Sequence, residues 1–196
     1  MKILKSLFVL VLSAFVISVS AQDSANPEIQ TKLVSFIDLT NQKNYAQAFD
    51  LMYPKMFDQV SKQDLIDLMS SMNDEGLSLQ IANPKITSYS APFQDGNETF
   101  VRLDYTADMV IDIAPGGMFD HPKPAQGMLE QFEATYGKEN VKYSEQEKRY
   151  TIMATKAMMA IQQNGEWFLV EINPDQMELM KSLFSEPVLN ALVMVK

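Results

Sequence analysis

The chain has 196 residues, of which 46% are hydrophobic, and this is enough for one domain with its own core. Its 25 acidic and 16 basic residues give a formal net charge of −9, which disfavours nucleic acid and anionic lipid surfaces as partners. It contains no cysteine, which excludes disulfides, a lipidated N-terminal cysteine and thiolate chemistry.

The N-terminus has the three parts of a secretory signal. Lys2 and Lys5 precede an apolar run over residues 7–19, and Ala21 ends it before a polar stretch. A membrane span needs about 20 apolar residues, and this run is shorter. We therefore expect residues 1–21 to be cleaved, and residues 22–196 to reach the periplasm or the medium without a lipid anchor or a membrane span.

The first third of the mature chain predicts three helices. Asn26 and Pro27 are typical of a helix start, and apolar residues at helical spacing extend the first helix over residues 27–40. A second helix begins at Asn44 and ends at or before Pro54. Ser61 opens a third, whose inward side is expected to carry Leu65, Leu68, Met69 and Met72.

After residue 77 the apolar pattern has a period of two, which predicts strands. Pro84 interrupts the first strand and places it at a sheet edge or a bulge. The turn residues Asp95-Gly96-Asn97 and Asn164-Gly165 predict hairpins, the second joining strands 150–161 and 166–172. The clearest strand has an apolar face formed by Val101, Leu103, Tyr105, Ala107, Met109 and Ile111.

An insertion over residues 114–149 separates these strands. It opens with two glycines and three prolines, and continues with a short amphipathic helix that Gly137 ends. A last helix starts at Pro174 and runs through Phe184. Helices segregated to one side of an antiparallel sheet make an α+β fold. We therefore expect a single domain of N-terminal helices packed on a curved antiparallel sheet, cone-like in shape, with a helical insertion.

Two segments resemble a known superfamily. The helical run Asn44 to Phe57 (NYAQAFDLMYPKMF) and the terminal hairpin Asn164 to Asn173 (NGEWFLVEIN) are similar to the nuclear-transport-factor-2-like superfamily, which has a cone-shaped fold shared with steroid delta-isomerase and polyketide cyclases. The resemblance implies that fold. The superfamily includes isomerases, cyclases, dehydratases and non-enzymatic binding or dimerisation modules, so the resemblance implies no single activity. The insertion departs from the plain form of the family.

The sequence lacks the residues that most catalytic sites need. His121 is the one histidine, so zinc has too few nitrogen or sulfur ligands and a serine triad has only a loop histidine as its base. Asp104, Asp108 and Asp112 share one strand face, but acids four positions apart are separated by about 13 Å, too far to hold one ion. They are interpreted as a solvated face. No metal and no cofactor are expected.

A pocket between the helices and the sheet is the remaining candidate site. Strand parity places Tyr105 on the apolar face of its strand, and Trp167 and Glu171 share one face of the last strand. A buried carboxylate and a buried phenol can act as an acid/base pair. The alternative is a tyrosine at the pocket rim and a glutamate paired with Lys156 or solvent. Phe168, Val170 and Ile172 are equally apolar, so parity leaves open which face lies inside.

Three hypotheses of function follow. The first is a non-catalytic module that binds a small apolar ligand or a protein partner, with Tyr105, Trp167 and Glu171 as ligand-binding residues. The second is an isomerase or dehydratase-type lyase, which burial of Glu171 without a cationic partner would favour. The third is a structural domain with a filled interior, since a ligand site needs about 300 Å³ of concave space. Apolar residues on both faces of strand 166–172 predict cover from the C-terminal helix or from a second copy in a homodimer.

Overall fold

The computed structural model describes residues 26–173 and 176–194. The predicted signal peptide, residues 1–21, lies outside the described residues, as does Pro174. Within the described part, no helix is long and apolar enough to cross a membrane.

The chain begins with helices, as predicted. They are α1 (Pro27–Asn41), α2 (Tyr45–Asp50), the 3-10 helix η1 (Pro54–Asp58) and α3 (Lys62–Asp74). The Asn26 side chain accepts hydrogen bonds from the backbone N–H groups of Glu28 and Ile29, and Ser61 accepts one from Asp64, so both predicted caps are confirmed. The prediction for Leu68 is wrong: its side chain is 55% exposed, and α3 contains no buried residue.

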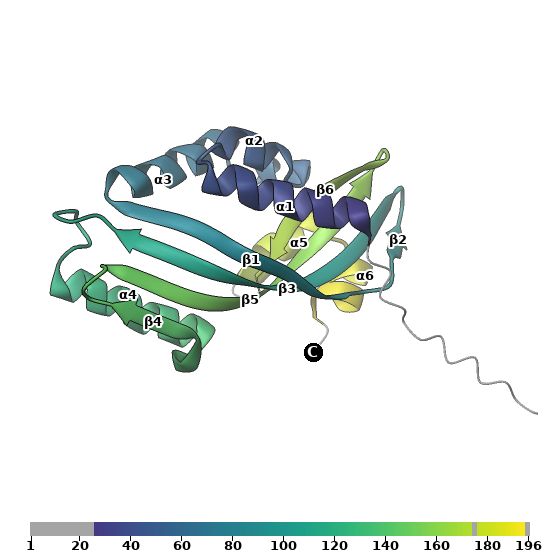
Figure 1. Ribbon diagram of the computed structural model, residues 1–196. Helices are drawn as coiled ribbons and strands as arrows, with labels where there is room; N and C mark the ends of the chain where they lie inside the picture. The colour runs from purple at the N-terminus through teal and green to yellow at the C-terminus, as the bar shows by residue number, and fades with distance from the viewer. Residues whose placement is uncertain (1–25, 174–175, 195–196) are drawn as a thin grey trace, which may run out of the picture.

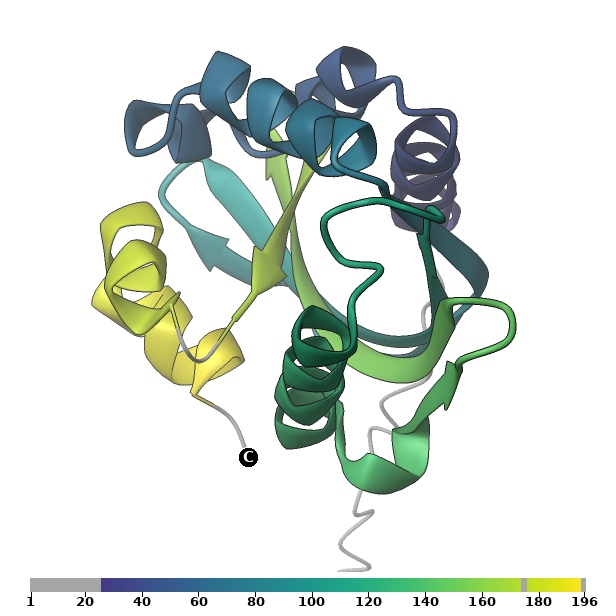
Figure 2. The same ribbon diagram turned by 90° about the vertical axis from the view of Figure 1, so that its left-hand side faces the viewer.

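A curved, six-stranded antiparallel sheet follows (Figures 1 and 2). Its strands are β1 (Leu77–Tyr89), β2 (Phe93–Asp95), β3 (Glu98–Ile113), β4 (Val141–Ser144), β5 (Arg149–Gln163) and β6 (Glu166–Ile172). The path β1-β3-β5-β4 leaves β1 at one edge, while β2 pairs with β3 and β6 pairs with β5. Both predicted hairpins form, β2–β3 and β5–β6.

The concave face of the sheet is covered by helices at two places. Near one end, Ile29, Leu33 and Ile37 of α1 pack against buried residues of β3, β5 and β6. Near the other end, α4 (Pro122–Tyr136) packs against the cluster that contains Ile111 and Tyr150. Since Ile111 belongs to the same alternating set as Tyr105, the helix of the insertion covers the same face as α1.

The insertion also contains a strand that the sequence pattern does not predict. After α4 and the short 3-10 helix η2 (Lys138–Asn140), β4 pairs with the first residues of β5. The helix itself ends as predicted at Gly137, which has a φ of 87°.

The C-terminal segment covers the convex side of β6. Helices α5 (Met177–Leu183) and α6 (Glu186–Val188) and the π-helical turn η4 (Leu189–Val193) form one cluster with Val170, Ile172 and Met159. Figure 2 shows these helices on the other side of β6 from α1 and α2. Both faces of β6 are therefore covered within one chain, Trp167 and Leu169 on the inner side and Val170 on the outer. The fold is α+β and cone-like, as predicted.

Candidate functional site

The structure brings two of the three predicted ligand-binding residues together. Tyr105 is 4% exposed and lies opposite Lys156 in the β3–β5 register. The Glu171 carboxylate accepts a hydrogen bond from Lys156 Nζ at 2.6 Å. Trp167 is also buried on this face, but its indole Nε1 donates to Glu28 Oε2 of α1 at 2.9 Å. The structure thus shows which face of β6 lies inside: Trp167, Leu169 and Glu171 are on the concave side of the sheet.

Lys156 and Glu171 form an ion pair in which the two charges neutralise each other. Burial by itself lowers the pKa of Lys156, but the Glu171 carboxylate and Tyr136 raise it, and the net shift is upward. Burial, with smaller contributions from Glu171 and Tyr136, raises the pKa of Tyr105. Glu171 is 44% exposed at the side chain and has a cationic partner. The burial without a cation that the acid/base hypothesis calls for is therefore not found.

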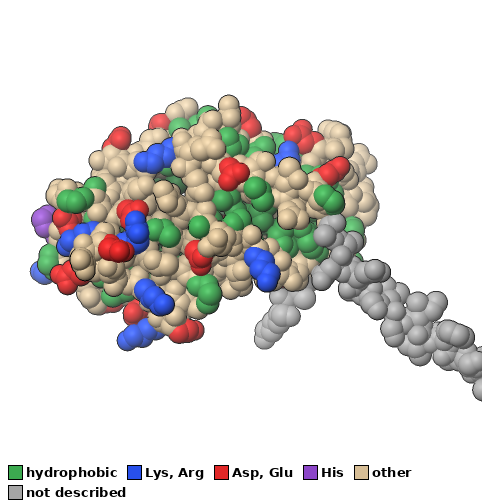
Figure 3. Space-filling view, viewed as in Figure 1, with side chains coloured by type: hydrophobic (Ala, Val, Ile, Leu, Met, Phe, Trp, Pro, Cys, Tyr) green, Lys and Arg blue, Asp and Glu red, His purple; other side chains and the backbone are tan. Residues whose placement is uncertain are grey.

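A concavity with a mixed apolar and polar lining lies elsewhere, between α1 and the second half of β1. This groove has a volume of about 320 Å³. Hydrophobic side chains gather between α1 and β1 in Figure 3, and Val34 of α1 is 40% exposed there. The lining consists of Gln30, Leu33, Val34, Pro84, Lys85, Ile86, Thr87, Ser88 and Tyr89. We call it the inner groove, because Ile86 and Tyr89 pack against the concave-face cluster.

The edge strand β1 explains where this groove begins. The Asn41 side chain donates to the Ile81 carbonyl oxygen and accepts from the Ile81 N–H, both at 2.8 Å, and so occupies the outer edge of β1. Pro84 then falls inside a register shift between Ala82 and Lys85. Beyond it, β3 is the one strand that pairs with β1 in the described part of the chain. From Lys85 onward α1 and β1 are separated by the groove that both elements line.

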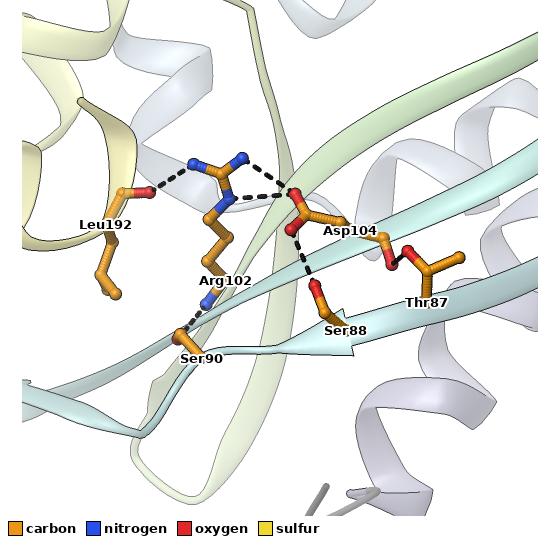
Figure 4. Close-up of polar contacts among 6 residues, drawn as sticks. All are labelled: Thr87, Ser88, Ser90, Arg102, Asp104 and Leu192. Carbon is orange, nitrogen blue, oxygen red and sulfur yellow. Dashed lines mark hydrogen bonds and ion pairs between the residues drawn. The ribbon is translucent and has the colours of Figure 1, made fainter. Parts of the chain in front are cut away.

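A second hollow, of about 270 Å³, lies on the opposite face of the same edge. We call it the outer hollow, and Figure 4 shows its polar side. Arg102 donates through Nε and Nη2 to Asp104 Oδ1, at 3.0 and 2.9 Å, and through Nη1 to the Leu192 carbonyl at 3.2 Å. Ser88 Oγ donates to Asp104 Oδ2 at 2.8 Å. The lining is Ser88, Tyr89, Ser90, Arg102, Asp104, Ala191 and Leu192.

His121 lines a third hollow, of about 260 Å³, at the start of α4. The neighbouring Asp120 accepts a hydrogen bond from the Gly116 N–H and forms an ion pair with Lys148, and these interactions lower the pKa of its carboxyl. His121 itself is exposed. A further depression of about 450 Å³ beside the N-terminus of α1 is lined by Pro27, Glu28, Thr31, Lys32, Ser35 and Leu51. Tyr105, Trp167 and Glu171 line none of these four concavities.

The acidic strand face is a set of local pairs. Asp104 bonds Arg102, Asp108 accepts from Asn83 and Asp112 pairs with Arg149. Over residues 26–173 and 176–194, no group of three His, Cys, Asp or Glu residues could hold a metal ion.

Sequence reasoning missed the inner groove, although two signals for it are present. Val34 lies next to the predicted apolar stripe of α1 and widens it by one residue. Pro84 marks the edge strand. The sequence does not reveal that Val34 and Pro84 lie close together, because α1 and β1 come side by side only in the folded protein.

No protein-family model matches this chain, and no curated protein sequence matches it. The assignment of function therefore depends on the geometry described above.

Proposed function

We propose that this chain is an exported, non-catalytic binding module whose ligand occupies the inner groove between α1 and β1. The observation that carries this proposal is the groove itself: a concavity of about 320 Å³, lined in part by apolar side chains, with an exposed valine on its wall. Ligand sites in proteins are concave, mostly apolar and fitted with a few polar groups. Here the polar groups are Gln30, Lys85 and Thr87, since the Ser88 hydroxyl donates to Asp104 in the outer hollow.

The concave face supports binding over catalysis. Tyr105 and Trp167 are buried on it, and the carboxylate that an isomerase-like acid/base pair would use is bound to the ammonium group of Lys156. The hydrogen bond from Lys156 occupies one of the two Glu171 carboxylate oxygens that such chemistry would use. The resemblance to the nuclear-transport-factor-2-like superfamily is compatible with this proposal, since that superfamily includes binding modules.

Nile red, an uncharged apolar dye, tests the groove directly. We expect it to bind the mature protein with increased fluorescence, and Val34→Gln to weaken the binding about tenfold, because an apolar contact of roughly 1.4 kcal/mol is lost. Met153→Gln is the matched control: Met153 is 55% exposed and lines none of the four concavities. Equal dye binding by the two variants would refute the site.

A further inference from the structure

The inner groove and the outer hollow share two lining residues. Ser88 and Tyr89 line both, and they are consecutive residues of the edge strand β1. Tyr89 packs on the concave side, whereas Ser88 bonds Asp104 in the outer hollow. The two hollows therefore lie on opposite faces of one strand edge.

A strand added to this edge would meet both hollows. Successive side chains of a strand point to opposite faces, about 3.3 Å apart along it. A register shift between Ile86 and Ser88 interrupts this alternation in β1, and beyond it Ser88 lies opposite Asp104 and Tyr89 opposite Leu103. The stretch from Lys85 to Ser90 is thus about 20 Å long and would pair with a segment of similar length. Alternate side chains of that segment would enter the inner groove and the outer hollow, while its backbone paired with β1. Main-chain bonds combined with alternating side-chain pockets are how sheet edges recognise peptides.

We propose that the ligand of this module is an extended peptide segment of another protein, which adds to β1 as a further strand and carries an acidic residue opposite Lys85. The proposal rests on the function proposed above and names the class of ligand. Apolar side chains of the peptide face α1, and short polar ones face Ser88, Ser90 and Arg102.

Charge separates this ligand from a second copy of the chain. Lys85 is exposed and forms no ion pair or hydrogen bond with the residues that the structure describes. The edge segment over residues 84–90, PKITSYS, contains no acid, so edge-to-edge pairing of two copies would bring two lysines to the interface. The acid that lines the outer hollow, Asp104, is already paired with Arg102. An acidic residue in a different peptide supplies the missing charge.

The test is selection of twelve-residue peptides from a random displayed library against the mature protein, followed by affinity measurement with fluorescein-labelled peptides. We expect selected peptides to alternate apolar and polar residues. Val34→Gln and Ala191→Gln should each weaken them about tenfold, because one alters the inner groove and the other obstructs the outer hollow. Lys85→Gln should weaken them about threefold, and Lys85→Arg should restore the affinity. Met153→Gln should leave it unchanged.

Hydrogen exchange on the wild-type protein is the independent readout. Bound peptide should slow exchange of amides between Lys85 and Ser90, which a ligand in one hollow alone would not do. If Nile red responds to Val34→Gln but no selected peptide depends on both Val34 and Ala191, the proposed function stands and the peptide proposal is wrong. A concentration-dependent dimer that Val34→Gln dissociates would also overturn it, in favour of a second copy. If neither dye nor peptide responds to Val34→Gln, the binding site itself is refuted.

Discussion

Lys156 is a mostly buried charged group that is paired with a carboxylate. Its side chain is 19% exposed, and Glu171 offsets its burial. Removing one partner of such a pair leaves a poorly solvated charge. We expect Glu171→Gln to lower the free energy of unfolding by about 1–3 kcal/mol, measured by urea denaturation. Glu178→Gln breaks the exposed pair with Lys181, 89% and 55% exposed at the side chains, and should change it by less than about 0.5 kcal/mol.

The pH dependence of this effect has a defined sign. The pKa of Lys156 is raised in the folded protein, so its stabilising effect is fully present below the ordinary lysine pKa, about 10.4, and is lost at higher pH. The stability difference between the wild type and Glu171→Gln should therefore narrow above that pH. A difference that stays constant to higher pH would show that the loss comes from packing and not from charge.

For single residues, prediction from the sequence succeeded where the alternation of side chains along a strand decides which face a residue occupies. Tyr105 lies on the apolar face of its strand, as alternation predicts. Parity could not choose between the faces of β6, because both are apolar. That choice depends on α1 and the C-terminal helices, which approach β6 from distant parts of the chain.

At the scale of single elements, two glycines should respond oppositely to the same change. Gly165 in the β5–β6 turn has a φ of 84°, whereas Gly127 lies in the interior of α4, and a Cβ atom at either position meets open space. Gly165→Ala should destabilise the protein by about 1–2 kcal/mol through backbone strain. Gly127→Ala should stabilise it by about 0.5–1 kcal/mol. Thermal unfolding of both variants measures this, and a shift of the same sign in both would contradict the assigned conformations.

Helix caps and hairpin turns were predictable because their signals are local. Asn26, Ser61 and Gly165 each act within a few residues of their own position. Strand β4 was not predictable in the same way: it has four residues, and it is a strand because it pairs with β5. The exposure of Leu68 has a similar cause, since tertiary packing decides which side of α3 faces the protein.

For the molecule as a whole, Phe184 connects three parts of the outer core. Its ring stacks near Tyr53 of the N-terminal helical segment, with centroids 6.4 Å apart, and meets Phe100 of β3 edge-on at 6.0 Å. We expect Phe184→Ala to cost about 3–5 kcal/mol in one cooperative urea transition. Met194→Ala, at a position 53% exposed, should change stability by less than about 0.5 kcal/mol. Two separate transitions would show that the C-terminal helices unfold independently of the sheet.

The contact of α1 with β6 joins two elements that lie far apart in the sequence. The Trp167 indole and the Glu28 carboxylate that it bonds are 139 residues apart in sequence, and the backbone of Leu169 bonds Leu51 and Tyr53. The packing of α1 is therefore complete only when the final hairpin is in place. Contacts between residues so far apart in sequence form slowly, so we expect the apolar side of α1 to be fully buried only late in folding.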